Sequence, residues 1–261
     1  MNLLRSIYAT ILFEFKRSMS PQRLALAGVL SLFPPTMLFF TTVSGSNLPI
    51  TELLILILVG MVSVLAQLLW ATPNVYSELE GKSWIFLASR PRGRIALFLG
   101  KYVSSVVFSY AICFIAITLC LAIKTYVPPR AMTNPAPDWI SLNGIALLSC
   151  FVYSAIFSLI GTLFQKRAMV LGVAYFVLSE IVIANVPAII SRFTGRYHLQ
   201  GIATKWLGWL HPVLTSSEYK AVFGDHSTGF HLICLLSGVL VILTAGCVAI
   251  MTRQYVTAEE T

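Results

Sequence analysis

The chain has 261 residues, of which 57% are hydrophobic and only 11% are charged, and its mean hydropathy is +0.82. Ordinary soluble domains do not have this composition, and membrane spans of about 20 residues each would use up most of the length. The sequence therefore predicts an all-α integral membrane protein with no sizeable soluble domain. The formal net charge of +8 fits basic loops beside membrane spans better than nucleic-acid binding, so no nucleic-acid partner is expected.

Residues 2–18 predict a short amphipathic helix ahead of the first span. Apolar side chains recur there at helical spacing, with basic and polar residues at the positions between them. One interpretation is an elbow helix lying in the membrane interface, and the alternative is an extension of the first span. Ser20, Pro21 and Arg23 interrupt the apolar run, which favours the separate elbow helix.

Six apolar runs predict transmembrane helices within a single transmembrane domain. They lie at about 24–43, 52–72, 102–123, 139–164, 168–190 and 230–251. Pro34 and Pro35 fall inside the first span and are expected to kink it. The segment 73–101 joins the second and third spans, and an outer loop, 191–229, precedes the sixth.

Basic residues are distributed unequally between the two sides of these spans. Six lie on the side of the outer loop, namely Lys124, Arg130, Arg192, Arg196, Lys205 and Lys220. The other twelve lie on the side of the termini, including Lys16, Arg17, Lys82, Arg90, Arg94 and Lys101. The positive-inside rule then makes both termini and the segment 73–101 cytoplasmic.

The segment 73–101 has a charge density that a simple connection between spans does not need. It carries two acids, Glu78 and Glu80, then Gly81 and Lys82, then an apolar patch that includes Trp84, and finally Arg90, Pro91 and Arg94. Charged rims around an apolar centre suggest a docking surface for a soluble partner. The alternative is that the apolar patch presses a short helix onto the bilayer surface.

Gly81, Lys82 and Ser83 resemble the end of a nucleotide-binding loop only superficially. The motif G-x-x-x-x-G-K-[ST] requires a glycine where this chain has Tyr76. No nucleotide site is therefore expected in this chain, and any nucleotide hydrolysis would be performed by another chain.

Glu180 is the acid expected deep inside a predicted span. A carboxyl group at that depth marks either a functional site, such as a substrate contact or a proton site, or a structural hydrogen bond to Gln67, Asn185 or Ser179. Both interpretations stay open. An enzyme in the membrane would need several His, Asp or Glu residues at one depth, so catalysis by this chain is not expected.

The outer loop carries two further features. Trp206, Trp209 and Pro212 predict short re-entrant helices at the outer interface, where indole rings favour the boundary between lipid and water. All four histidines, His198, His211, His226 and His231, lie in or beside this loop. Their spacing matches no compact ligand motif, so no metal site is expected.

Taken in order, the residues of the central segment resemble a family pattern. That pattern comprises Glu78, Glu80, Gly81, Ser83, Leu87, Ser89-Arg90-Pro91, Arg94 and Gly100-Lys101, and it is followed in the outer loop by Leu210-His211-Pro212 and Phe223-Gly224. This ordered set resembles the membrane permeases of type-2 ABC exporters. Lys82 departs from the pattern, since a small hydroxylated residue is commoner there, and the chain has no large extracellular domain.

The resemblance implies a permease subunit of the plasma (inner) membrane that forms a substrate pathway with a second copy of itself or with a similar chain. It implies a cytoplasmic coupling helix between the second and third spans that docks on a separate P-loop ATPase, which would hold the ATP and magnesium. The implied coupling residues are Glu78, Glu80, Gly81, Lys82, Trp84, Arg90, Pro91 and Arg94, and the re-entrant helices would close the outer end of the pathway. The alternative from another class is a self-contained secondary transporter or channel that uses Glu180, although the two halves of the chain show no convincing repeat.

Overall fold

The computed structural model describes residues 3–44, 50–73, 78, 84, 92–127, 135–164, 167–183, 192–207, 226–253 and 255, with the backbone alone for 50–59. The elements in these ranges are α1 (Leu3–Ser18), α2 (Pro21–Val43), α3 (Ile50–Trp70), α6 (Gly93–Tyr126), α7 (Ala136–Leu163), α8 (Ala168–Tyr175), the π-helix η1 (Phe176–Val182), α9 (Gly195–Leu207) and α11 (Thr228–Thr252). All of them are helices, which confirms the all-α prediction for the part of the chain that is described.

Four of these helices, α2, α6, α7 and α11, are long and apolar enough to cross a membrane. They coincide with the predicted first, third, fourth and sixth spans. Two shorter apolar stretches, Gly60–Trp70 and Ala168–Val182, occupy the predicted second and fifth spans. The chain is therefore a multi-pass membrane protein in its described part, and the count of six spans stays a prediction.

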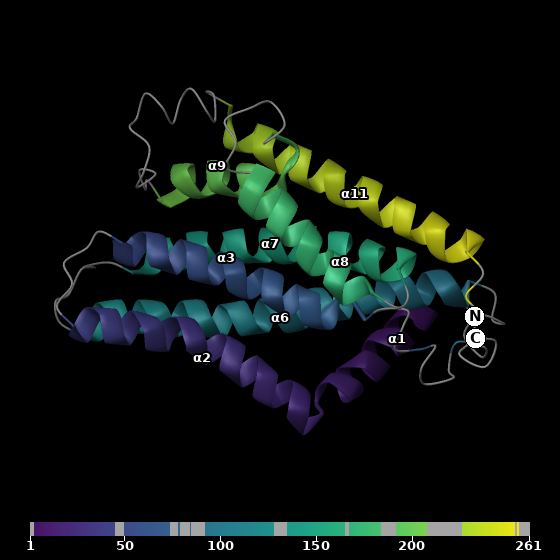
Figure 1. Ribbon diagram of the computed structural model, residues 1–261, viewed down its shortest axis with the longest axis horizontal. Helices are drawn as coiled ribbons and strands as arrows, with labels where there is room; N and C mark the ends of the chain where they lie inside the picture. Colours follow the sequence, from purple (N-terminus) through teal and green to yellow (C-terminus); the bar gives the residue numbers. More distant parts are fainter. Residues whose placement is uncertain are drawn as a thin grey trace.

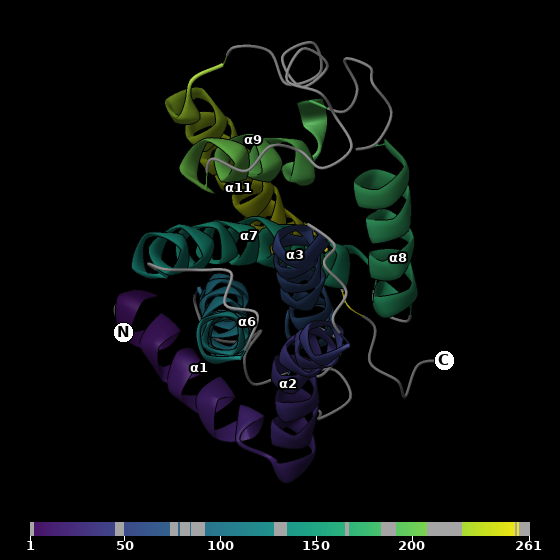
Figure 2. The same ribbon diagram turned by 90° about the vertical axis from the view of Figure 1, so that its left-hand side faces the viewer.

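Helix α6 is the central element of the bundle. It packs against α1, α2, α3 and α7, while α11 and α9 pack on α7. Figure 2, which looks along the bundle, shows α6 with α1, α3 and α7 around it. Figure 1 shows that α1 begins and α11 ends at one end of the bundle, and that α9 lies at the opposite end.

Hydroxyl groups and small residues hold the apolar helices close together. The Ser105 and Ser154 hydroxyls bond to each other between α6 and α7, and the Tyr102 hydroxyl donates to the Phe151 carbonyl at 3.3 Å. A Cβ added at Gly161 would fall on the Thr72 carbonyl oxygen. In a membrane, where helices gain little from excluding water, such close contacts and interhelical hydrogen bonds carry the packing.

Helix α6 starts earlier than the sequence predicts. Its first residue is Gly93, preceded by Arg92 in the left-handed conformation with φ at 63°, whereas the predicted span began at 102. Ala96, Leu97 and Phe98 are buried, because α1 and α11 pack against α6. Tertiary packing thus extends the helix through residues that polarity had assigned to the cytoplasmic segment.

Candidate functional site

The Glu180 side chain, which is 1% exposed, is surrounded by hydrogen-bond donors. The Tyr153 hydroxyl donates to Oε2 at 2.8 Å, and the hydroxyls of Tyr175 and Ser179 each donate to Oε1 at 3.4 Å. The backbone N–H of Arg196 donates to Oε2 at 2.9 Å. We call these five residues the Glu180 network. It joins η1, α7, α8 and α9 through one carboxyl group.

Arg196 binds Glu180 twice, because its Nη1 also donates to the Glu180 main-chain carbonyl at 2.9 Å. A π-helix such as η1 shifts the backbone hydrogen-bond partner by one residue, and π-helical turns occur frequently at functional sites. The Glu180 carboxyl meets the first turn of α9, where free N–H groups and the helix dipole favour negative charge. A Cβ at Gly195 would lie 3.2 Å from Val152 Cγ1, so glycine allows the start of α9 to pack closely on α7 beside the carboxyl group.

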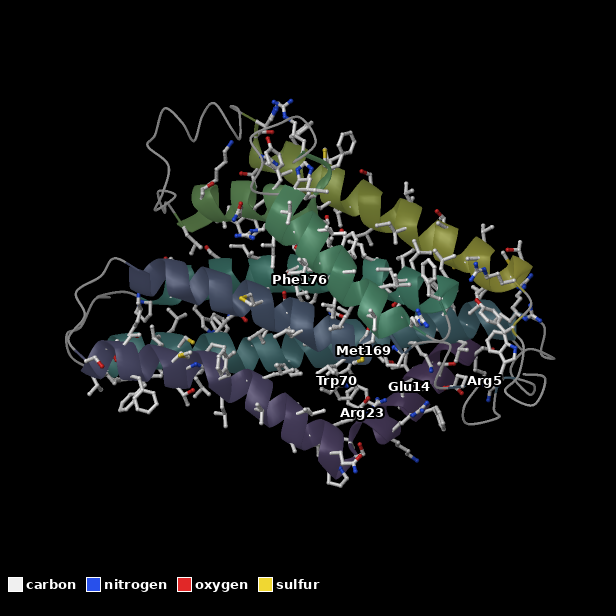
Figure 3. The ribbon with its side chains drawn as sticks, in the orientation of Figure 1. Arg5, Glu14, Arg23, Trp70, Met169 and Phe176 are labelled. Atoms are coloured by element: carbon white, nitrogen blue, oxygen red, sulfur yellow. The ribbon has the colours of Figure 1, made fainter. Side chains whose placement is uncertain are left out.

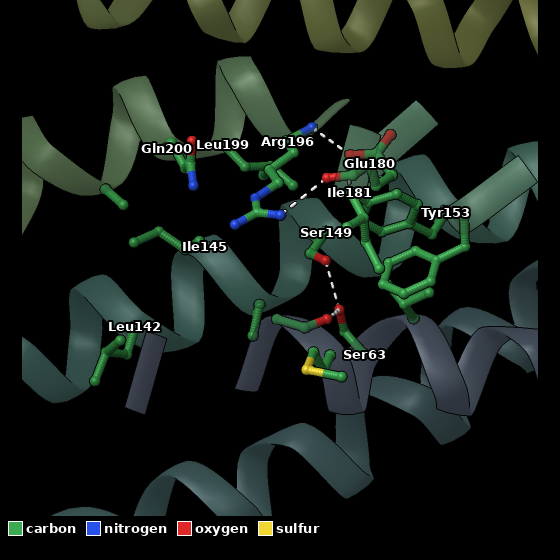
Figure 4. Close-up of a pocket in the computed structure, with 16 residues that line it drawn as sticks. Ser63, Leu142, Ile145, Ser149, Tyr153, Glu180, Ile181, Arg196, Leu199 and Gln200 are labelled. Carbon is green, nitrogen blue, oxygen red and sulfur yellow. Dashed lines mark hydrogen bonds between the residues drawn. The ribbon is translucent and has the colours of Figure 1, made fainter. Parts of the chain in front are cut away.

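A cavity of about 370 Å³ lies beside this network, between α3, α7, η1 and α9. Figure 4 shows the Arg196 side chain running from α9 toward α7 on the cavity side. Ser63 of α3 and Ser149 of α7 line the same cavity, and their hydroxyl oxygens are 2.6 Å apart. The lining is otherwise mainly apolar, which is typical of a small-molecule site with a few convergent polar groups.

The sequence identified Glu180 but not most of its partners. Of the three structural partners that the sequence offered, Ser179 does bind the carboxyl group. Gln67 instead donates to the Cys150 carbonyl at 3.2 Å, and Asn185 lies outside the described residues. Arg196 and Tyr153 were missed, because nothing in the local sequence brings a loop arginine or a residue of another helix to this carboxyl group.

A second cluster of charges joins α1, α6 and the segment between α3 and α6. Lys101 Nζ lies 2.7 Å from Glu78 Oε1 and 3.4 Å from Glu14 Oε1, and Arg17 Nη1 lies 3.0 Å from the same Glu78 oxygen. We call Glu14, Arg17, Glu78 and Lys101 the anchor cluster. Figure 3 shows its Glu14 near Arg23, beside the corner between α1 and α2.

Both acidic and apolar members of the predicted coupling surface are buried where the structure describes them. The exposed fraction is 2% for Glu78 and 4% for Trp84. Trp84 packs edge-on against Tyr255 with ring centroids 4.7 Å apart, and the Arg94 guanidinium lies 5.6 Å from its ring. Both side chains thus pack against the bundle in this structure, and their part in coupling stays a prediction. Glu80, Gly81, Lys82, Arg90 and Pro91 lie outside the described residues.

The outer segment contains one helix, α9, in its described part. Trp206 lies on α9 against Gly144 of α7 and is 40% exposed, while Trp209 and Pro212 lie outside the described residues. The structure thus has a helix at Trp206, and its re-entrant character stays a prediction.

Two of the histidines form a pair at this end of the molecule. The Nδ1 atoms of His198 and His231 are 3.0 Å apart, and His198 Nε2 lies 2.9 Å from the Arg192 carbonyl. Burial lowers the pKa of His198, which favours its neutral form. Neutral His198 then donates through Nε2 and accepts at Nδ1, so His231 donates through its own Nδ1. The two imidazole rings thus hydrogen-bond to each other. The described residues hold no group of three or more potential metal ligands.

Comparisons with known proteins add no family to these observations. A scan against protein-family models and a search of curated proteins found no match to this chain.

Proposed function

We propose that this chain is the membrane-spanning permease subunit of an ATP-driven type-2 ABC exporter that works with a separate cytoplasmic ATPase. The observation that carries the proposal is how the segment between α3 and α6 is fixed. Glu78 is paired with Lys101 and Arg17, and Trp84 packs against Tyr255. Both points lie where a partner docking at this end of the bundle would transmit force to α1, α6 and α11.

Buried ion pairs support this proposal, because a loop that only connects two spans does not need such costly interactions. Removing charges from water costs several kcal/mol per ion, roughly, and the mutual attraction of the charges does little more than offset that cost. What a buried cluster does provide is a defined position. A segment that must present a docking surface in one place needs such a position, whereas a loop that only joins two spans does not.

Helix α1 fits the role of an elbow helix at the membrane surface. Leu4, Tyr8, Leu12 and Phe13 are exposed, while the charged Glu14 is buried against the bundle. A helix with its apolar side chains outward is stable where lipid covers them. In this proposal the chain has six spans, lies in the plasma (inner) membrane with both termini in the cytoplasm, and forms the pathway with a second copy or a similar permease.

The coupling segment then contains two kinds of residue. Glu78 and Trp84 position the segment through buried contacts with the bundle, and the Arg94 guanidinium lies 5.6 Å from the centre of the Trp84 ring. Contact with the ATPase is assigned to Glu80, Gly81, Lys82, Arg90 and Pro91. Nucleotide hydrolysis belongs to the partner, so this chain is proposed as a permease and not as an enzyme.

The test is affinity purification of the chain from its native host in mild detergent, with mass spectrometry and an ATPase assay on the recovered complex. We expect a P-loop ATPase to be recovered with the wild type and lost with Arg90→Glu. Lys16→Glu is the matched control, since it reverses an exposed basic charge on α1 and should keep the partner. Recovery of the chain alone, with transport in liposomes driven by an ion gradient, would contradict the proposal and favour a secondary transporter.

A further inference from the structure

The cavity beside Glu180 has two chemically different walls. Helices α3 and α7 contribute mainly apolar side chains, among them Met61, Val64 and Ile145. The other side carries the polar groups Arg196 and Gln200 of α9 and Glu180 of η1, beside the apolar Leu199 and Ala203. The two serines between α3 and α7 bond each other, so their hydroxyl groups already have partners. A ligand that fills this space needs an apolar part for one wall and a polar part for the other.

The Arg196 guanidinium defines the polar part. A guanidinium carries five N–H donors and no acceptor, and the bond to the Glu180 carbonyl uses one nitrogen. The Glu180 carboxyl receives its donors from hydroxyl groups and from the α9 backbone. Among the ion pairs of the described residues, none joins the Arg196 guanidinium to this carboxyl. The other end of the guanidinium lies on the cavity side (Figure 4), where its N–H groups can donate to acceptor oxygens of a ligand.

We propose that the cavity binds a single-chain amphiphile whose head carries anionic oxygens, either a carboxylate or a phosphate. The head accepts hydrogen bonds from Arg196, with which carboxylate and phosphate form charge-assisted, often bidentate, pairs. The apolar chain lies along the apolar side chains that α3 and α7 present to the cavity. The volume of about 370 Å³ is at the low end of the range of about 300–1,000 Å³ for small-molecule sites, so it suits one apolar chain rather than two. This inference does not depend on an ATPase partner.

The test uses the full chain in nanodiscs of phosphatidylcholine, because detergents are themselves amphiphiles and would compete. Three photoreactive probes of equal chain length are compared: a fatty acid, a lysophosphatidic acid and an uncharged monoacylglycerol. We expect saturable labelling by an anionic probe on peptides of α3, α7 or α9, with about tenfold weaker labelling by the uncharged probe. Tenfold corresponds to one charge-assisted hydrogen bond. The stronger of the two anionic probes identifies the head as a carboxylate or a phosphate.

A cavity-filling variant tests the location of the site. Gly60 lines the cavity, and a Cβ at this position would meet no atom within 4 Å. Gly60→Leu should therefore fold and lower the labelling by the anionic probe at least about tenfold. Gly28→Leu and Gly238→Leu are matched controls, since a Cβ at these helical glycines also meets no atom within 4 Å and neither lines the cavity. Both controls should label like the wild type.

A charge variant tests the role of Arg196. Arg196→Gln should remove the preference for anionic over uncharged probes, and Arg196→Lys should restore part of it. Arg192→Gln makes the same charge change at an exposed residue and should leave the preference intact. Continued labelling of Arg196→Gln by the uncharged probe shows that the cavity has survived. Labelling that does not saturate, that ignores Gly60→Leu, or that keeps its anionic preference in Arg196→Gln overturns the proposal.

Discussion

Glu180 illustrates how one buried carboxyl group can organise several helices. Its two oxygens accept from Tyr153 on α7, from Tyr175 on α8, and from the backbone at the start of α9. Two oxygens that only accept match donors arriving from several directions. An amide at this position would offer one oxygen and one NH₂ group, so at least one donor would face another donor.

We therefore expect Glu180→Gln to destabilise the protein rather than to preserve it. An unsatisfied buried donor costs about 1–3 kcal/mol, which should appear as a lower Tm in thermal unfolding of the chain in nanodiscs. Ser179→Ala is the control, because it removes a weaker bond of 3.4 Å from the same carboxyl group. A Tm for Glu180→Gln equal to that of the wild type would show that the donors have no structural role.

The anchor cluster gives a second prediction for single residues. Lys101→Met leaves Glu14 and Glu78 buried together with Arg17, and loss of one partner from a buried pair costs about 3–5 kcal/mol. Adding Glu78→Gln removes the repulsion between the two acids that Lys101→Met leaves behind. In a double-mutant cycle followed by Tm, the double variant should be more stable than Lys101→Met alone. Additive losses would argue against direct pairing.

For single residues, the sequence predicted features that depend on the chemistry of a side chain and missed features that depend on the geometry of the fold. Glu180 could be recognised because a carboxyl group in an apolar run is unusual. Its contact with Arg196 could not, because that contact depends on the fold of a segment 16 residues away in the chain. The burial of Glu78 was likewise hidden, since a charged residue in a polar segment is normally solvated and only the approach of α1 and α6 removes it from water.

At the scale of elements, the helices follow from apolar runs, but their ends and irregularities follow from packing. The long apolar stretches of α2, α6, α7 and α11 were predicted well because composition alone decides them. The early start of α6 was not predicted, because its first turns are stabilised by neighbours. Neither was the π-helical turn η1, for which residues 176–182 give no local signal.

The contact of α7 with the end of α3 should be sensitive to a single methyl group. A Cβ at Gly161 would fall on the Thr72 carbonyl oxygen, and backbone atoms cannot move aside as a flexible side chain can. We expect Gly161→Ala to cost about 1–3 kcal/mol through overpacking, measured as a decrease in Tm. Gly28→Ala, whose Cβ has open space, should be neutral or slightly stabilising. Equal stability of the two variants would contradict the packing described between α7 and α3.

At the scale of the whole molecule, the two ends of the bundle differ in character. Figure 1 shows the start of α1 and the end of α11 at one end and α9 at the other. Lys101 of the anchor cluster lies near the start of α6, and the histidine pair joins α9 to the start of α11. The excess of basic residues at the first end predicts that it faces the cytoplasm.

Single cysteines introduced into a cysteine-free variant test this orientation. Arg5 at one end and Tyr126 and Phe193 at the other are exposed, so each should tolerate the change. A membrane-impermeant maleimide added to intact cells should label Tyr126→Cys and Phe193→Cys, and should label Arg5→Cys only after permeabilisation. The reverse pattern would place the anchor cluster outside the cell.

The length of α6 has a mechanical consequence. It runs without a proline from Gly93 to Tyr126, and Lys101 ties it to α1 near its first turns. The stretch beyond Lys101 is about 38 Å long at 1.5 Å per residue, so a tilt of about 5° about that point moves its far end by about 3 Å. If α6 rotates as a rigid body about the anchor cluster, a small rotation at the basic end becomes a displacement of atomic size at the other end.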